Sequence, residues 1–349
     1  MIEIEHLSKR YGEHLAVDDL SFQVDSGQIY GFLGPNGAGK STTMNIMTGC
    51  LSATDGHVRI DGYDIFEEPN KAKKLIGYLP EHPPLYMNET PLEYLRFVGE
   101  AKGLRGAELT GQITQVIHQT KIEDVAHRRI SALSKGYRQR VGIAQALLGG
   151  PKVIILDEPT VGLDPIQIIE IRDLIKELGQ THTVIFSSHI LSEVQAICDQ
   201  ILIIAKGKLI AFDTAENLEK LLLSSNEIDI VSDAAAAEIQ EILSGVGHIT
   251  GLNVAETDAG FVSAQIKTDC DNVYELSRAI FSAFVEGGAI LLEMSVKKAN
   301  LEEVFIELTE TGATGTNGIA AKDTATENII ADEISEAVSR ITEGEVVDE

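Results

Sequence analysis

A glycine-rich segment places a lysine and a serine at a fixed spacing from two glycines. In residues 31–43, GFLGPNGAGKSTT, the residues Gly34, Gly39, Lys40 and Ser41 form the pattern GxxxxGK[ST]. Glycines let backbone N–H groups approach phosphate oxygens, because no Cβ stands in the way, and the N-terminus of a following helix adds a partial positive charge. In this pattern the lysine reaches the β- and γ-phosphates, and the hydroxyl ligates Mg²⁺. We therefore expect a loop that binds nucleotide phosphates, in preference to a plain glycine-rich turn.

An acidic pair ends a second apolar run, VIILDE at 153–158. Ligands of open α/β sheets bind at the carboxyl ends of the strands, which is where Asp157 and Glu158 fall. We expect Asp157 to hold Mg²⁺, directly or through water. We expect Glu158 to orient or deprotonate the water that attacks the γ-phosphate. A solvated turn is the alternative, but the PTVGLDP that follows is too specific for one.

These residues need a sheet to position them. Short β-branched apolar runs bounded by Gly, Pro or charge predict strands, and they are QIYGFLG, KVIILDE, TVIFSSH and ILIIAKG. Helical patterns lie between them, among them STTMNIMTGC, PLEYLRFVGEAKG and IQIIEIRDLIKELGQ. Continuous apolar strands that alternate with helices indicate a mostly parallel, buried sheet of the α/β class. The start of the chain alternates instead, through Ile2, Ile4, Leu20, Phe22 and Val24, and predicts a small antiparallel portion.

The chain divides into three parts by pattern. Residues 1–220 hold the motifs described above, and residues 225–310 predict a βαββαβ order plus a helix, the split-βαβ pattern of a small ferredoxin-like α+β domain. That second part carries no charged or Cys/His constellation suited to catalysis, so we expect a packing or regulatory domain. Residues 311–349 begin small and polar and continue as the amphipathic IIADEISEAVSRI. A tethered acidic helix that docks on a partner is the alternative there, and we expect a disordered tail.

The composition narrows the class of partner. With 28 basic and 54 acidic residues the net charge is −26, which argues against nucleic acid and against an anionic membrane surface as direct partners. The N-terminus lacks the pattern of a signal peptide, and no window of about 18 apolar residues predicts a membrane span. Three scattered cysteines, Cys50, Cys198 and Cys270, indicate reduced thiols in a cytosolic protein. We expect all three to be small core residues.

Further motifs carry a resemblance to a known family. LSKGYRQR at 133–140 resembles the signature motif of ATP-binding cassette (ABC) ATPases, usually LSGGQxxR, and lies just upstream of VIILDEPTVGLDP as it does there. His189 after VIFSS matches the family's switch histidine, Asp164 in GLDP matches its D-loop, and Tyr11 matches the aromatic residue that stacks on adenine. The resemblance covers about residues 1–220, and six motifs follow one another in the family's order.

The resemblance implies an ATPase with ATP and Mg²⁺ as cofactors. The residues implied to bind ATP are Tyr11, Gly34, Pro35, Asn36, Gly37, Ala38, Gly39, Lys40, Ser41, Thr42, Ser134, Gly136 and Asp164. Ser134 and Gly136 present a hydroxyl and a backbone N–H at a helix N-terminus, a second anion site. In the family that site lies far from the phosphate loop of its own chain. Two subunits packed head to tail therefore enclose two ATP molecules, with His189 and Glu158 at each γ-phosphate.

One position departs from the usual family pattern. The segment IGYLPEHPPLY matches the family's Q-loop, with Glu81 where glutamine usually stands. A glutamate keeps an acceptor oxygen for Mg²⁺ but adds charge and loses the amide donor; mere exposure to solvent is the alternative for Glu81. We expect Glu81 among the metal ligands and catalytic residues. Together with Lys135 and Tyr137 it resembles the branch that pairs with a separate ABC-2-type permease, including the gliding-motility type.

The segment after Glu81 bears on the partner. In the family this helical region forms the groove that receives a coupling helix of the membrane subunit, and its apolar residues Leu85, Tyr86, Leu92, Leu95 and Phe97 mix core and groove. The resemblance implies a transporter subunit that needs a second cassette, expected to be another copy, and separate permease subunits. It would then sit in the cytoplasm against the membrane, with export favoured by the branch. The alternatives are a cassette ATPase that remodels a macromolecule and a binding module without turnover.

Overall fold

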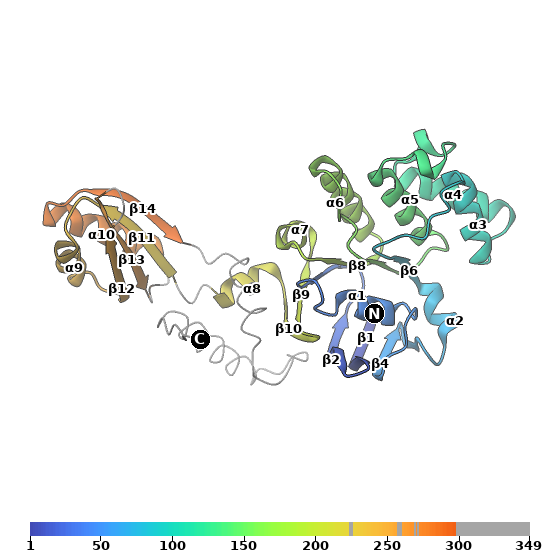
Figure 1. Ribbon diagram of the computed structural model, residues 1–349, viewed down its shortest axis with the longest axis horizontal. Helices are drawn as coiled ribbons and strands as arrows, with labels where there is room; N and C mark the ends of the chain where they lie inside the picture. Colours follow the sequence, from blue (N-terminus) through green and yellow to red (C-terminus); the bar gives the residue numbers. More distant parts are fainter. Residues whose placement is uncertain (223–225, 257–259, 269, 271, 298–349) are drawn as a thin grey trace. The chain divides into compact units, whose positions relative to one another are not determined.

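The chain folds into two compact units. The computed structural model describes residues 1–222, 226–256, 260–268, 270 and 272–297. The first unit is Met1–Ala215 and the second begins at Glu216 (Figure 1). The helix predicted at 300–310 and the tail predicted at 311–349 lie outside the described residues.

A six-stranded sheet forms the centre of the first unit, in the order β10-β9-β3-β8-β7-β6. Its strands are β3 (Ile29–Leu33), β6 (Ile76–Leu79), β7 (Val153–Leu156), β8 (Thr183–Ser188), β9 (Gln200–Ala205) and β10 (Lys208–Asp213). All neighbours pair in parallel except β9 and β10. Every residue of β3, β7 and β8 is buried, as a sheet covered on both faces requires. The predicted parallel sheet is therefore confirmed.

A second sheet, in the order β2-β1-β4-β5, begins the chain. Its strands are β1 (Ile2–Tyr11), β2 (His14–Val24), β4 (Asp55–Ile60) and β5 (Tyr63–Asp64). They pair antiparallel, with Ile2 opposite Val24 and Ile4 opposite Phe22. These four side chains are buried, so the alternation in the sequence does mark the face of this sheet that packs on the core.

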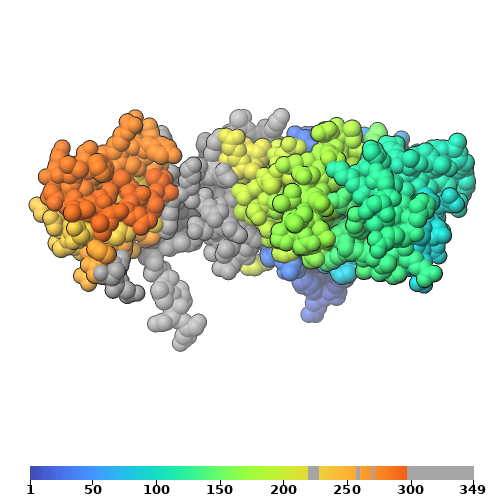
Figure 2. Space-filling view, turned by 90° about the horizontal axis from the view of Figure 1, so that it is seen from above, coloured from blue at the N-terminus to red at the C-terminus, as the bar shows by residue number. Residues whose placement is uncertain are grey.

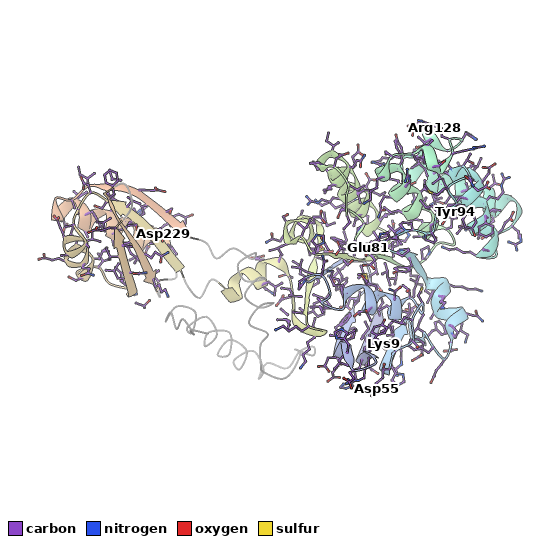
Figure 3. All side chains as sticks on the ribbon, viewed as in Figure 1. Lys9, Asp55, Glu81, Tyr94, Arg128 and Asp229 are labelled. Carbon is purple, nitrogen blue, oxygen red and sulfur yellow. The ribbon has the colours of Figure 1, made fainter. Side chains whose placement is uncertain are left out.

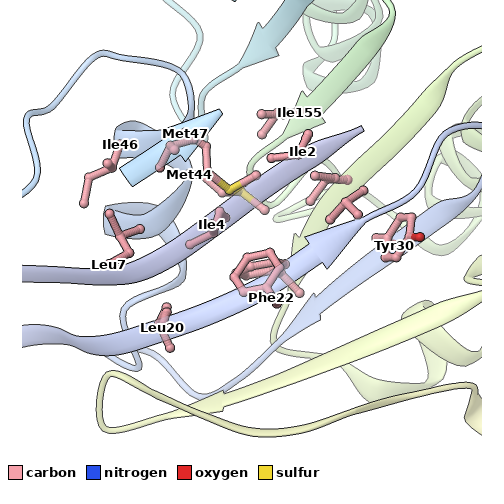
Figure 4. Close-up of a cluster of buried hydrophobic side chains, with 14 of the residues drawn as sticks. Ile2, Ile4, Leu7, Leu20, Phe22, Tyr30, Met44, Ile46, Met47 and Ile155 are labelled. Carbon is pink, nitrogen blue, oxygen red and sulfur yellow. The ribbon is translucent and has the colours of Figure 1, made fainter. Parts of the chain in front are cut away.

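Helix α1 (Lys40–Met47) is packed into the core that the two sheets share. Its Met44, Ile46 and Met47 are fully buried and belong to one cluster with Ile4 of β1 and Phe32 of β3 (Figure 4). Burying a large apolar side chain contributes roughly 1.5–3 kcal/mol to stability. The three residues thus fix α1, and with it the loop that precedes it, against both sheets.

A helical part separates β6 from β7 and gathers at one end of the first unit (Figure 2). It contains α3 (Pro91–Ala101), α4 (Gly106–Gln119) and α5 (Lys135–Leu147). Helix α3 starts with a capping box, in which Thr90 accepts from the Glu93 backbone and Glu93 accepts from the Thr90 backbone. The other helices of the unit are α2 (Pro69–Ala72), α6 (Pro165–Gly179) and α7 (Leu191–Ile197), and α8 (Ala215–Leu222) follows β10.

The second unit has the predicted split-βαβ order. Its elements are β11 (Asn226–Ser232), α9 (Ala236–Ser244), β12 (Ile249–Glu256), β13 (Val262–Thr268), α10 (Val273–Gly287) and β14 (Leu291–Lys297). The strands form an antiparallel sheet in the order β12-β13-β11-β14. Ile230 of the sheet and Ile239, Ile280 and Phe284 of the two helices are buried in one core. The helices therefore pack on the sheet through a core of their own.

Two predictions from the sequence concern the burial of the cysteines and the presence of membrane-spanning helices. Cys50 is exposed, so the prediction that all three cysteines are core residues is wrong; it follows the end of α1, beyond the buried face of that helix. Cys198 and Cys270 are half-buried. Among the described residues, no helix has the length and apolar character needed to cross a membrane.

Candidate nucleotide-binding site

The glycine-rich loop joins β3 to α1. Gly39 has φ +106°, a left-handed conformation that favours glycine, and a Cβ there would lie 2.6 Å from the carbonyl oxygen of Ala16. Gly39 also stands at the N-cap of α1, and no side chain caps that helix within the described residues. The first N–H groups of a helix lack partners inside it. The loop therefore presents uncapped backbone donors and the positive end of a helix to whatever lies in front of it.

Lys40 is held inside the loop. Its side chain is only 5% exposed, and its Nζ donates to the carbonyl oxygens of Gly34 at 2.6 Å and Pro35 at 3.3 Å. The same Nζ lies 3.4 Å from Oε1 of Glu158, whose side chain is 7% exposed. A buried charge needs a partner of opposite sign, so the ammonium and carboxylate compensate each other. An anion entering the loop would compete with this pair for the ammonium.

Ser41 faces the carboxylate of Asp157 across the site. Ser41 Oγ donates to Asp157 Oδ1 at 3.2 Å, and Ser187 Oγ donates to the same oxygen at 2.7 Å. Burial raises the pKa of Asp157 above its ordinary value and the charge of Glu81 adds to this effect, whereas the hydroxyls of Ser187 and Ser41 and the charge of Lys40 lower it. The charged carboxylate thus lacks full compensation inside the protein and would gain from a cation beside it.

Glu158 leaves β7 in a strained conformation. Its φ is +48°, which is uncommon for a residue with a side chain, and its N–H donates to Ser187 Oγ at 2.8 Å. Its Oε2 lies 3.0 Å from Nδ1 of His189. Strained backbone of this kind persists only where the surroundings hold it, and it gathers at functional sites. Here it turns a carboxylate toward both Lys40 and His189.

A cleft of about 520 Å³ collects most of the predicted site residues. Its lining includes Tyr11, Pro35, Asn36, Gly37, Ala38, Gly39, Lys40, Ser41, Thr42, Glu81, Glu158 and His189. Tyr11 is the last residue of β1 and is half exposed. Glu81 follows β6, where the helical part meets the central sheet (Figure 3). The structure thus brings residues from five separate segments of the first unit to one opening.

Ser134, Gly136 and Asp164 lie elsewhere, in a second cleft of about 470 Å³. Ser134 caps α5 by accepting from the Tyr137 backbone, and Asp164 caps α6 by accepting from the Gln167 backbone at 2.9 Å. A Cβ on Gly136 would lie 2.7 Å from the amide end of the Gln167 side chain, so the starts of the two helices lie close together. None of the three lines the first cleft.

The donor set fits magnesium bound together with phosphate. Ser41 and Asp157 offer a hydroxyl and a carboxylate, which are oxygen ligands that Mg²⁺ accepts, but Mg²⁺ usually completes its shell with water and substrate phosphates. Among the described residues no group of three or more His, Cys, Asp or Glu side chains could hold a metal ion. Ser41 and Asp157 therefore offer two oxygen ligands to a metal ion that takes its other ligands from water or substrate.

Sequence reasoning missed two residues of this site. Ser187 bonds both Asp157 and the Glu158 backbone, and it is fully buried. The available signal was the polar pair SS in VIFSSH, which interrupts an apolar strand next to a motif histidine. His14 lines the first cleft and is paired with Tyr11 across the turn from β1 to β2. The sequence could have indicated His14 through its position in the same short segment as Tyr11.

Known proteins with related descriptions match this chain over most of its length. The family described as ABC transporter matches residues 17–161. The linearmycin resistance ATP-binding protein of Bacillus subtilis is 33% identical over 313 residues, which cover 88% of this chain and 98% of that protein. The bacitracin transport ATP-binding protein of Bacillus licheniformis is 32% identical over 320 residues, covering 90% of this chain and 99% of that protein.

A solved structure resembles the first unit. The dimeric structure of a bacterial ABC transporter cassette matches with a TM-score of 0.56 and 27% sequence identity, covering 61% of this chain and 98% of the other. The match agrees with the fold predicted from the motifs, a parallel sheet that carries a phosphate loop between its first strand and the next helix. The relatives named above are consistent with the ABC-2-type branch that the motifs indicated.

Proposed function

Since this chain belongs to the ABC transporter family, as an ATP-binding subunit and ATPase, we propose that two copies of it close around two ATP molecules and drive a separate permease. One observation carries the proposal. The elements suited to phosphate, metal and water lie in one cleft, while Ser134, Gly136 and Asp164 lie in another of similar size. Each chain thus presents two incomplete halves of a site, and head-to-tail pairing would join unlike halves.

In the proposed complex the loop takes the phosphates. The uncapped N–H groups at the start of α1 bind phosphate oxygens, and Lys40 moves from the carbonyls of Gly34 and Pro35 to the β- and γ-phosphates. Tyr11 offers its half-exposed ring to the adenine. When Lys40 binds the phosphates, it gives up its 3.4 Å contact with Glu158. ATP binding would in this way release the carboxylate for its role in hydrolysis.

Hydrolysis is assigned to Glu158 and His189. Glu158 accepts a proton from the attacking water, or orients that water, and His189 holds both the carboxylate and the γ-phosphate in place. Their 3.0 Å contact before nucleotide binds supports the pairing. Ser41 and Asp157 would hold Mg²⁺, and Glu81, which lines the same cleft as Ser41, would be a further ligand. When bound there, the ion would supply positive charge next to the phosphate oxygens.

The permease would dock on the helical part. Tyr86 and Phe97 are about half exposed, and their rings lie 5.1 Å apart between centroids. The ring of Tyr94 meets that of Tyr86 edge to face, with 5.7 Å between centroids. Tyr94 and Leu95 are both buried and belong to the core. Exposed neighbouring aromatic residues are typical of interaction surfaces. This surface would hold the cassette in the cytoplasm at the face of the membrane.

Export is the direction we propose. Two relatives are named for linearmycin resistance and bacitracin transport, and both match this chain along nearly their whole length. A transporter confers resistance when it moves the antibiotic outward, and this chain resembles those proteins over about nine tenths of its length. The cargo would be recognised by the permease, since no cleft of the cassette is assigned to it.

The decisive experiment uses Glu158→Gln. Glutamine keeps the size of the side chain but cannot accept the proton, so ATP should remain bound while phosphate release falls by about 100-fold or more. The protein mass measured by light scattering with ATP and Mg²⁺ should be that of a dimer, and without nucleotide that of a monomer. Phosphate release at the wild-type rate would refute the role of Glu158. A monomer with ATP bound would refute the sandwich.

A further inference from the structure

Glu193 of α7 carries a buried carboxylate that has no place in the proposed chemistry. Its side chain is 2% exposed, and it does not line the cleft that holds Lys40, Glu158 and His189. A carboxylate is seldom buried to this extent unless its oxygens are satisfied. The groups that satisfy it therefore indicate what it does.

Two hydroxyls donate to the same oxygen of Glu193. Thr160 Oγ1 lies 2.7 Å from Oε2, and Ser188 Oγ lies 2.9 Å from it. Thr160 stands two residues after Glu158, and Ser188 immediately precedes His189. One buried oxygen thus ties together the two segments that carry the proposed catalytic pair, at the ends of the adjacent strands β7 and β8.

The other oxygen of Glu193 faces Arg172 of α6. Nη2 of Arg172 lies 3.9 Å from Oε1, and Nε of Arg172 is buried without a hydrogen bond among the described residues. The guanidinium supplies the opposite charge at a distance too long for a hydrogen bond. The hydroxyls of Thr160 and Ser188 are consequently the close contacts that this carboxylate makes.

We propose that Glu193 is a positioning residue for ATP hydrolysis. Through its hydrogen bonds with Thr160 and Ser188, it holds Glu158 and His189 in their positions relative to each other. This inference rests on the roles proposed above for that pair. Glu158 has a left-handed backbone that its surroundings must maintain. Ser187 fixes its N–H from one side, and the Thr160–Glu193 bond fixes the chain two residues later. Small misplacements of reacting groups lower turnover steeply.

Loss of the Glu193 carboxylate should affect the turnover of ATP and the binding of ATP differently. Lys40 and Ser41 are the first residues of α1, and neither contacts Glu193 in the hydrogen bonds and ion pairs described above. Losing the acceptor at Glu193 should therefore lower kcat and leave the affinity for ATP unchanged. A residue that merely stabilised the fold would not show this split between kcat and affinity.

The test compares Glu193→Ala and Thr160→Val with a matched control, Thr120→Val. Thr120 is, like Thr160, a buried threonine whose hydroxyl donates a 2.7 Å hydrogen bond, but its acceptor is the Val116 carbonyl near the end of α4. We expect kcat for phosphate release to fall at least tenfold in the first two variants and to change less than twofold in the control. The Kd for ATP, measured by titration, should change less than threefold in all three.

Two further variants keep the result interpretable. Glu193→Gln retains a carbonyl oxygen that accepts from both hydroxyls, so it should keep more turnover than Glu193→Ala. If Glu193→Ala does not fold, Thr160→Val and Ser188→Ala each remove one of the two hydrogen bonds and carry the test. Wild-type kcat in both would overturn the inference, as would a loss of ATP affinity equal to the loss of kcat.

Glu158→Gln, measured in the same assay, separates this inference from the proposed function. If Glu158→Gln turns over normally, the assignment of the catalytic pair fails, and the role of Glu193 fails with it. If Glu158→Gln is inactive while Thr160→Val and Glu193→Ala behave like Thr120→Val, only the positioning role is refuted. If all three site variants lose turnover with ATP affinity intact, both stand.

Discussion

Nδ1 of His189 lies 3.0 Å from Oε2 of Glu158, although the two residues are 31 positions apart along the chain. Glu158 comes two residues after the end of β7, and His189 comes directly after β8. The two strands are parallel neighbours in the central sheet, so their carboxyl ends meet at one edge. The pairing of acid and imidazole is therefore a direct consequence of strand order.

Replacing this imidazole should slow hydrolysis. We expect His189→Ala to lower kcat by about 100-fold or more, since positioned acid–base groups contribute factors of that size, with ATP affinity changed less than about threefold. Phosphate release and ATP titration measure the two effects. His118→Ala is the matched control, because His118 also contacts a glutamate, Glu123, at 2.7 Å but on an exposed surface. Equal turnover in both variants would contradict the assignment.

Removing the ammonium should act on binding itself. Hydrogen bonds to charged groups contribute about 1.5–3 kcal/mol, so Lys40→Ala should weaken ATP binding by roughly 10- to 100-fold. Lys73→Ala serves as control, since Lys73 also donates to a loop carbonyl, that of Gly49 at 2.9 Å, outside the cleft. Calorimetric titration of each variant with ATP and Mg²⁺ gives the affinities. An unchanged affinity for Lys40→Ala would refute the phosphate loop.

Asp157 should make the stability of the nucleotide-free protein depend on pH. Burial raises the pKa of Asp157 in the folded state, so above that pKa the folded chain holds a carboxylate that the unfolded chain solvates better. This penalty is full above the raised pKa and disappears as pH falls toward the ordinary value of about 3.9. Asp157→Asn has no charge to bury. It should therefore be more stable than the wild type at pH 7.5.

Urea unfolding followed by circular dichroism at several pH values measures this difference, which should shrink as the pH is lowered. Asp173→Asn is a suitable control, because Asp173 is exposed on α6. With ATP and Mg²⁺ the order should reverse, since a ligand that binds only the folded state stabilises it and Asp157→Asn lacks a metal ligand. A variant less stable than the wild type at pH 7.5 without nucleotide would contradict the argument.

The aromatic surface on the helical part should be needed at the membrane and dispensable for catalysis in solution. We expect Phe97→Glu to leave ATP hydrolysis by the purified protein within about twofold, because Phe97 is 51% exposed and lies outside both clefts. A buried aromatic anchor contributes about 2 kcal/mol or more to an interface. The affinity of the protein for membranes of its own cells, measured by sedimentation at several membrane concentrations, should therefore fall roughly 30-fold.

Tyr274→Glu is the control for that experiment, since Tyr274 is 70% exposed on α10 of the second unit. It should sediment with membranes as the wild type does. Normal sedimentation of Phe97→Glu would place the permease contact elsewhere. Loss of hydrolysis in the purified Phe97→Glu protein would show that the substitution disturbs the fold instead.

The sequence by itself determined the chemistry. Gly34, Gly39, Lys40 and Ser41 are close neighbours, so their spacing alone specifies a loop that presents N–H groups, an ammonium and a hydroxyl. The alternation of Ile2 and Ile4 likewise marks the buried face of β1. Local patterns of this kind fix backbone conformation and the direction of side chains, and both are properties of a few consecutive residues. The α/β class follows from them.

Tertiary structure alone decided which of these residues meet. Ser187 bridges Asp157 and Glu158 because β8 pairs with β7, and Glu193 joins Thr160 to Ser188 because α7 packs beside both. It also placed Cys50 in solvent and Leu95 in the core, which composition does not distinguish. Strand order and helix packing depend on contacts between segments far apart in the chain. The physical reason is that a side chain becomes buried only when many residues from different segments pack around it, whereas a motif consists of a few consecutive residues.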